Sequence, residues 1–439
     1  MRKNYSILNK AVGLALAATM MLGFTSCEDI LGHWEKPTPA AVTPEEPAGT
    51  DLSMVDCAGN ARTSMSTANC YMVHTAGDYK LPLVYGNAIK DGAANTAAYT
   101  GIENANTTLT FPNHAGNAIN APWITKAATG EGVNKGMGIT VSSAELLWQD
   151  AQGLVTAVGI DGDYLTLTVG KDATTQQGNA LVAAKDADGN IVWSWHIWVT
   201  TETFASLTTV ATGSHNYKVT PVNLGWVSTG GDGKKGYAPY YQWGRKDPFK
   251  GTGAPADLTV YDIDGTAIAG LTYKASTTAT IADNIKNPTT HYYNSSTKGP
   301  CDTQYYNMWD AEQKTAGNNI TTATKKTVYD PCPAGFCVPT SNLYYYMKDS
   351  SSKTWDGINM GYTWENNGGI TGGPLFFPAS GYRNSGSGSV GSVGSYGHCW
   401  SASPGGGGYG YCLYFNSSGD GVSGSERSYG DSVRAVAEE

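Results

Sequence analysis

Residues 191–200 read Ile-Val-Trp-Ser-Trp-His-Ile-Trp-Val-Thr and predict a β-strand that is buried on both faces. Successive side chains of a strand point to opposite faces. Trp193 and Trp195 therefore share one face, while His196 and Trp198 share the other. Because both faces carry large side chains, we expect this strand to be central in a β-sandwich. His196 has no second metal-ligating residue at useful spacing, so we interpret it as a buried, hydrogen-bonded histidine.

The segment before this strand supplies its hairpin partner. Residues 180–184 are apolar, and residues 186–190 read Asp-Ala-Asp-Gly-Asn. Asp-Gly between two apolar runs is a strong hairpin signal. The β-branched and aromatic run at 164–169 predicts a further strand.

The composition agrees with a mostly β protein. The chain has 439 residues, of which 55 are Gly, 27 Tyr and 12 Trp, while charged residues make up only 15 %. Aromatic-rich, Gly-rich chains are typical of many short strands joined by tight turns. The formal net charge of −9 comes without a basic stripe. Nucleic acid is therefore excluded as a general partner.

The first residues predict an exported, lipid-anchored protein. Arg2, Lys3 and Lys10 accompany an apolar run at 11–24, which ends just before Cys27. A run of this length is short for a membrane span and suits a signal peptide. Small residues before a cysteine resemble the lipobox of bacterial lipoprotein signals. That resemblance implies cleavage of residues 1–26 and acylation of Cys27, which would bind outer-membrane lipid.

The segment after Cys27 predicts display at the cell surface. Glu28 and Asp29 resemble the surface-export signal of Bacteroidetes lipoproteins, which implies an outer-membrane lipoprotein facing outward. A periplasm-facing lipoprotein is the alternative. Residues 27–50 contain four prolines and few apolar residues, so we expect an extended tether without a core.

Residues 51–205 are expected to form the first folded module. The segments at 69–73, 77–82 and 193–198 resemble a domain of Bacteroidetes surface lipoproteins and fimbrillin-like proteins. The resemblance implies an immunoglobulin-like or fimbrillin-like β-sandwich and no chemistry. Arg62 precedes the first predicted strand and is a candidate processing site if the chain polymerises as a structural pilin.

Residues 206–439 are expected to form a second domain. The ordered motifs at 237–249, 329–340, 375–383 and 398–401 resemble the Fibrobacter succinogenes major paralogous domain. The resemblance implies an α+β fold akin to C-type lectins and to the formylglycine-generating enzyme, rich in loops. A helix is expected over 340–348, with Thr340 or Ser341 as N-cap.

The cysteines suggest structure rather than catalysis. Relatives of the formylglycine-generating enzyme use a cysteine pair that binds copper, but Cys399 and Cys412 flank a Gly-rich hairpin loop. We therefore favour a cross-strand disulfide between them, and Cys57 and Cys70 are a second candidate pair. No familiar catalytic motif is present, so we expect no catalytic residues and no enzyme activity.

The lectin-like resemblance also suggests ligand residues. Aromatic, amide and carboxylate side chains of the kind that hold sugars are Trp355, Asp356, Asn359, Trp364, Asn366, Asn367 and Trp400. The competing interpretation places Trp355 and Trp400 in the core and residues 366–369 in a turn. No metal or cofactor is expected, and calcium lacks a clear motif.

These observations predict a non-enzymatic, lipid-anchored adhesion or recognition protein of the cell surface. It would act as a fimbrial accessory or tip-like subunit, or as a standalone adhesin. Its partners would be a glycan or protein on a host or neighbouring cell, or other fimbrial subunits. The alternatives are a glycan-binding lipoprotein of a polysaccharide-capture system and a structural pilin.

Overall fold

The predicted hairpin around 186–190 is present in the computed structural model, which describes residues 46–439 except 104–107, 232, 254–255, 294–304 and 351. β11 (Gly178–Lys185) pairs antiparallel with β12 (Ile191–Val199), and the amide of Asp186 donates to the carbonyl of Asn190 at 3.0 Å. Gly189 adopts φ +81°, the left-handed conformation that the turn requires and that glycine adopts at little cost.

β12 is an inner strand, as its sequence predicts. All but its first residue are buried, and β2 (Cys70–Val73) pairs in parallel along its other edge. The sheet has the order β2-β12-β11-β8-β20-β21. Its remaining strands are β8 (Ser143–Gln149), β20 (Val260–Tyr261) and β21 (Ala267–Ile268).

A second sheet contributes to the same core. Its order is β1-β3-β10-β9, with bounds Thr50–Asp51, Gly77–Pro82, Tyr164–Val169 and Val155–Asp161. Leu165 and Leu167 of β10 belong to the buried cluster that also holds Trp195 and Ile197 of β12. Alternating side chains of the two sheets thus share one apolar interior.

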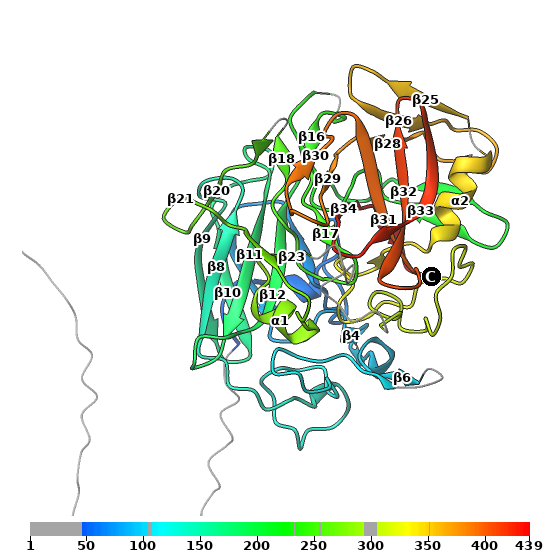
Figure 1. Cartoon of the computed structure of the whole chain (residues 1–439). Helices are drawn as coiled ribbons and strands as arrows, with labels where there is room; N and C mark the ends of the chain where they lie inside the picture. Colours follow the sequence, from blue (N-terminus) through cyan, green and yellow to red (C-terminus); the bar gives the residue numbers. More distant parts are fainter. Residues whose placement is uncertain (1–45, 104–107, 232, 254–255, 294–304, 351) are drawn as a thin grey trace, which may run out of the picture. The chain divides into compact units, whose positions relative to one another are not determined.

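The C-terminal region is built around a long antiparallel hairpin and its neighbours. The order is β30-β29-β34-β31-β32-β33, with β17 also paired to β34. The bounds are β30 (Val390–Gly391), β29 (Tyr382–Arg383), β34 (Gly430–Val433), β31 (Tyr396–Pro404), β32 (Tyr409–Asn416), β33 (Gly419–Glu426) and β17 (Tyr241–Gln242). Figure 1 shows the strands of this sheet from β29 to β34 in orange and red, with α2 (Ser341–Ser350) packed against β32 and β33.

Short strands complete the described residues. One sheet runs β24 (Phe336–Cys337), β35 (Val436–Ala437), β14 (Asn216–Val219), β13 (Thr208–Ala211) and β27 (Ile370–Thr371). Another runs β25 (Lys353–Asp356), β26 (Gly361–Trp364) and β28 (Leu375–Pro378). Two-stranded pairs are β4 (Ile89–Lys90) with β5 (Ala93–Ala94), β6 (Ile102–Glu103) with β7 (Thr108–Leu109), β15 (Val227–Ser228) with β16 (Gly236–Tyr237), β18 (Thr252–Gly253) with β19 (Ala256–Asp257), and β22 (Thr272–Ala275) with β23 (Thr290–Tyr293).

Helices are few and short. α2 begins one residue after Thr340, close to the predicted start. α1 (Ile281–Lys286) begins with a capping box, in which Thr280 and Asp283 satisfy each other's backbone amides. In the described part of the chain, 3₁₀ turns occupy Leu52–Met54, Thr96–Ala98 and Gly132–Asn134. Of the residues that the structure describes, 40 % are in strands and 6 % in helices, so the fold is mostly β.

The segments expected as two modules share one interior. Residues 46–439 form one compact unit, and β20 of the second segment pairs with β8 of the first. Trp195 and Trp243 belong to the same buried cluster. No helix among the described residues is long and apolar enough to cross a membrane. The expected boundary at residue 206 stays a prediction.

Candidate recognition surface

A cavity of about 240 Å³ opens beside the turn that joins β25 to β26, and we call it the β25–β26 cavity. Its wall combines ammonium, amide, aromatic and aliphatic groups. They include Lys234, Lys235, Tyr237, Ile358, Asn359 and Met360. A mixed lining of this kind is typical of recognition sites, in which a few polar groups orient a ligand against apolar surface.

Asp356 fixes the conformation of the turn. Its carboxylate accepts hydrogen bonds from the backbone amides of Ile358 at 3.0 Å and Asn359 at 2.9 Å, and from the Asn359 side chain at 2.8 Å. These hydrogen bonds, first those from Asn359, lower the pKa of Asp356 to about 2, and Lys234 lies 3.6 Å away. The carboxylate therefore stays charged, and its hydrogen bonds hold the turn in one conformation.

Two apolar side chains of this turn face solvent. Ile358 is 78 % exposed and Met360 is 45 % exposed. Met360 also adopts φ +52°, a conformation that non-glycine residues seldom take. Exposed aliphatic groups on a strained turn cost stability, and such features concentrate where a surface binds something.

The floor of the cavity is held by buried hydrogen bonds. The Tyr240 hydroxyl donates to the carbonyl of Ser380 and lies 3.2 Å from the Thr252 hydroxyl. The amide of Ala379 donates to the carbonyl of Met360 at 2.8 Å. The cavity is therefore built on a rigid base, which lowers the entropic cost of binding.

The structure corrects the expectation that tryptophans form the ligand platform. Trp364 and Trp400 are fully buried. Their indole nitrogens donate to the carbonyls of Met347 at 3.1 Å and Tyr241 at 2.8 Å. Trp355 is partly buried, with its ring centroid 5.3 Å from that of Tyr362. The competing interpretation, that Trp355 and Trp400 belong to the core, holds for Trp400, and Trp355 packs only partly buried against it.

The predicted polar residues separate into two places. Asn359 lines the β25–β26 cavity, whereas Asp356 does not line it and lies 3.6 Å from the lining residue Lys234. Asn366 and Asn367 are exposed in the turn after β26, where the Asn367 amide group donates to the Ser352 hydroxyl at 3.2 Å. The last two residues do not line the β25–β26 cavity, because their turn lies at the opposite end of β26.

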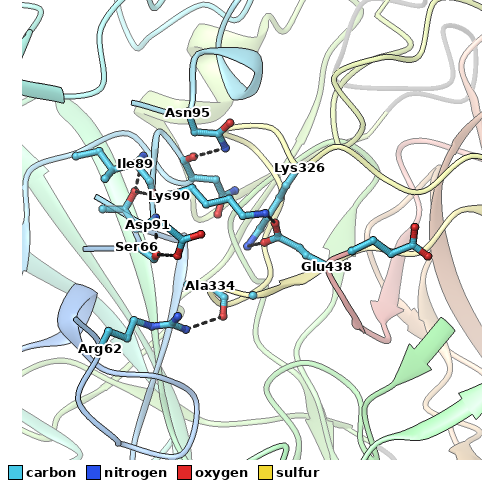
Figure 2. A pocket seen from close by; sticks show the side chains of 13 residues that line it. Arg62, Ser66, Ile89, Lys90, Asp91, Asn95, Lys326, Ala334 and Glu438 are labelled. Atoms are coloured by element: carbon cyan, nitrogen blue, oxygen red, sulfur yellow. Dashed lines mark hydrogen bonds and ion pairs between the residues drawn. The ribbon is translucent and has the colours of Figure 1, made fainter. Parts of the chain in front are cut away.

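A second cavity, of about 270 Å³, is lined mostly by charged and amide groups (Figure 2). Glu438 lies 3.7 Å from the buried ammonium of Lys326 and also pairs with Lys90. Lys326 donates to the carbonyls of Cys332 at 2.9 Å and Pro333 at 2.7 Å. Since these groups pair with one another, we interpret them as a clasp between distant parts of the chain, and we call it the Glu438 clasp.

Arg62 lies at the edge of the same cavity. Its guanidinium donates to the carbonyls of Val55 at 3.0 Å and Ala334 at 3.3 Å, and its amide donates to Met54 at 2.7 Å. The residue is thus engaged in structure on both its backbone and its side chain. Processing at Arg62 stays a prediction, and a protease would first have to release these bonds.

The predicted disulfides are not formed. The thiols of Cys57, Cys70, Cys399 and Cys412 are all free and buried. Cys399 lies opposite Leu413, and Cys412 lies opposite Trp400, so the two side chains point to opposite faces of the sheet. The Cys57 thiol instead points toward the carbonyl of Ala334, 3.9 Å away. Burial raises the pKa of Cys57 and Cys399 to about 12, which leaves these thiols unreactive.

His196 is buried and hydrogen-bonded, as its sequence context predicts. Its Nε2 lies 2.8 Å from the side-chain oxygen of Asn179, and its Nδ1 lies 3.3 Å from the Tyr241 hydroxyl. Burial lowers its pKa to about 3, so the imidazole is neutral. Cys27, Glu28 and Asp29 lie outside the described residues.

Sequence reasoning missed a buried polar network that joins the two expected modules. The Lys246 ammonium donates to the Ser194 carbonyl at 2.9 Å and hydroxyl at 2.6 Å, and to Asp247 at 2.6 Å. Burial lowers the pKa of Lys246 to about 8. Serine–lysine pairs serve some hydrolases. The cavity beside Lys246 measures only about 10 Å³, room for one water, so the contact is structural.

The sequence carried one signal of this network, a Lys-Asp pair within the aromatic-rich segment 237–249. Its partner Ser194 lies 52 residues earlier, and no spacing rule connects the two.

Among the described residues, His398, Cys412 and Asp431 are the one group of three metal-ligating side chains found together. A thiol in the group makes it unlike the all-oxygen sites that calcium prefers.

Comparison with known proteins adds no family to these observations. No protein-family model, no curated protein and no solved structure matches the chain. The function is therefore argued from the residues and their geometry.

Proposed function

We propose that the chain is a non-enzymatic, lipid-anchored recognition protein of the cell surface, which binds a protein ligand at the β25–β26 cavity. The observation that carries the proposal is the exposed pair Ile358 and Met360 on a fastened turn. A partner that covers these apolar groups would stabilise the complex by about 25 cal/mol per Å² of apolar surface removed from water. The exposed Lys235 at this cavity favours a partner segment that carries acidic residues.

The proposal assigns separate tasks to parts of the chain. Cys27 would carry the lipid, and residues 28–45 would act as tether, because Glu46 already pairs with Lys80 and Thr50 begins β1 of the folded unit. The two sheets that share the Trp195 core are interpreted as the fimbrillin-like sandwich, and residues 206–439 as the lectin-like part that presents the cavity. Recognition groups on loops over a rigid scaffold are the usual arrangement for binding proteins.

A glycan is the second candidate ligand. The Asn359 amide and the Tyr237 ring at the cavity are groups that suit a sugar. Neither ligand class requires chemistry from the chain. Two roles would use the same surface. In polysaccharide capture the bound glycan would be free for import, and in adhesion it would be attached to another cell.

Anchoring is tested with Cys27→Ser in the native host. We expect wild-type protein to incorporate labelled palmitate and to be degraded when protease is added to intact cells. Cys27→Ser should incorporate no label and leave the membrane fraction. Equal labelling of both proteins would disprove lipidation at Cys27, and protection of the wild type from protease would disprove surface display.

Binding is tested by measuring how cells that display the protein adhere to immobilised extracellular-matrix proteins and to a broad glycan array. The test variant is Ile358→Ser combined with Met360→Ser. The control is Ile263→Ser, because Ile263 is also exposed, at 37 %, and does not line the cavity. Loss of adhesion in the double variant alone supports the site. Binding only on the array transfers the proposal to glycans, and equal adhesion of both variants disproves the site.

A further inference from the structure

Three potential metal ligands meet on one face of the C-terminal sheet. His398 lies on β31, Cys412 on β32 and Asp431 on β34. Trp400 lies opposite Cys412 on one side and opposite Val433 on the other. His398 is two residues before Trp400, and Asp431 is two residues before Val433. Both side chains therefore point to the same face of the sheet as Cys412. One ligand atom from each residue lies within 4.8 Å of the other two.

Asp431 is a buried carboxylate without a hydrogen bond. The residue is fully buried, and neither of its oxygens has a hydrogen-bond partner among the described residues. His398 Nδ1 lies 3.7 Å from one of these oxygens, and it also makes no hydrogen bond. A buried charge left in this state costs several kcal/mol, and proteins relieve it by pairing or by coordinating a metal. The site therefore lacks one positive partner.

The ligand set selects the kind of ion. In a tetrahedral zinc site the ligand atoms are about 3.5 Å apart, as follows from metal–ligand distances near 2.0–2.3 Å. The His398–Asp431 separation of 3.7 Å is close to that value. Imidazole and thiolate suit zinc, whereas calcium and magnesium require oxygen ligands.

We propose that His398, Cys412 and Asp431 bind one Zn²⁺ ion. The thiol proton is released to water on binding, so that thiolate and carboxylate together neutralise the ion. The His398 side chain is 16 % exposed, so the ion would enter along this imidazole, and a water molecule would complete its coordination. The bound ion would link three strands of one sheet. This inference stands independently of the proposed ligand at the β25–β26 cavity.

The experiment measures metal content and cobalt spectra of the purified full-length protein. We expect one equivalent of zinc after dialysis against zinc and then buffer. Co²⁺ in its place should give a cobalt–thiolate charge-transfer band in the near ultraviolet. His398→Ala, Cys412→Ser and Asp431→Asn should each weaken zinc binding about 100-fold or more, and Cys412→Ser should abolish the cobalt–thiolate band.

Cys399→Ser is the matched control, because Cys399 is an equally buried thiol on the opposite face of the same strand pair. It should keep both the zinc and the band. Far-ultraviolet circular dichroism checks that each variant folds, and His398→Ala is decisive if the buried variants do not. Absence of zinc binding by the wild type, or full stoichiometry in folded His398→Ala, would overturn the proposal.

Discussion

Two buried lysines, Lys246 and Lys326, each have defined partners, and removal of a partner has a predictable cost. Lys246 and Asp247 are 3 % and 2 % exposed, and they share the Ser194 hydroxyl. Lys326 is equally enclosed, with Glu438 and two carbonyls around its ammonium. Partners this specific favour one arrangement of the chain, because any other arrangement leaves a charge buried alone.

Asp247→Asn should destabilise the protein by about 3 kcal/mol or more, because it leaves the Lys246 ammonium buried without its carboxylate. Equilibrium unfolding in urea measures the loss. Asp188→Asn is the control, since Asp188 is exposed in the β11–β12 turn, and it should change stability by less than about 0.5 kcal/mol. Equal effects of the two substitutions would contradict the network.

His196 predicts a fall in stability on acidification. The folded imidazole has a pKa of about 3, whereas an unfolded one titrates near 6.5. Between these values the unfolded state binds a proton that the folded state does not, so the free energy of unfolding falls as pH falls. At pH 5 the effect is about 2 kcal/mol relative to pH 7.

Comparison with His196→Gln isolates this effect. Buried Asp150, Asp310 and Asp330 have raised pKa values and act in the opposite direction, but equally in both proteins. Unfolding in urea at pH 7 and pH 5 should show a smaller loss in the variant, by about 2 kcal/mol. The same loss in both proteins would show that His196 is not the titrating group.

At the scale of elements, the sequence pattern predicted where strands form but not the register in which they pair. The alternation of large side chains predicted β12 and its hairpin with β11 correctly. The hairpin around the Gly-rich loop at 404–408 also forms, as β31 and β32. Yet Cys399 meets Leu413 rather than Cys412. A shift of one residue turns a side chain to the other face, and no feature of the loop sequence reports that shift.

The ligand residues were misread for a related reason. Tryptophan is a residue type that often stacks against sugars, but residue type alone does not show which face of a strand the rest of the protein buries. Trp364 and Trp400 both lie on buried faces. Asp356 and Asn359 were named for their residue types alone, and their roles as ligand residues stay a prediction. The Asp-x-x-Asn turn that joins them by hydrogen bonds was not recognised in the sequence. The His398–Cys412–Asp431 group could not be predicted from the sequence, because its residues lie on three different strands and come together only when these strands pair.

The six described cysteines should remain reduced in the native protein. In buffer, a thiol reagent should label none of them, because all six are buried. After denaturation under nitrogen it should label at least these six. Fewer labelled thiols would show that a disulfide forms despite the opposite facing of Cys399 and Cys412.

Gly397→Ala should destabilise the β31–β32 hairpin by about 1–3 kcal/mol, because the added methyl group would lie 1.9 Å from the buried ring of Phe415. Thermal unfolding measures the difference. Gly419→Ala is the matched control, since nothing lies within 4 Å of its added methyl group. A control as destabilised as the test variant would refute the close approach.

For the molecule as a whole, the shared core predicts cooperative unfolding. The cluster around Trp195 extends from Leu52 to Ala435, so neither expected module has this interior to itself. Calorimetry of the full chain should show one transition for residues 46–439, with equal calorimetric and van't Hoff enthalpies. Two separate transitions would instead support independent domains with a boundary near residue 206.

The Glu438 clasp has a consequence for biogenesis. Lys90 and Glu438 are 348 positions apart, and a ribosome adds residues in order at about 5–20 per second. The region around Lys90 therefore waits, for about 17–70 s, before its partner is synthesised. An exported chain with this topology would cross the inner membrane before it can fold, and its early strands need protection from aggregation until the last ones arrive.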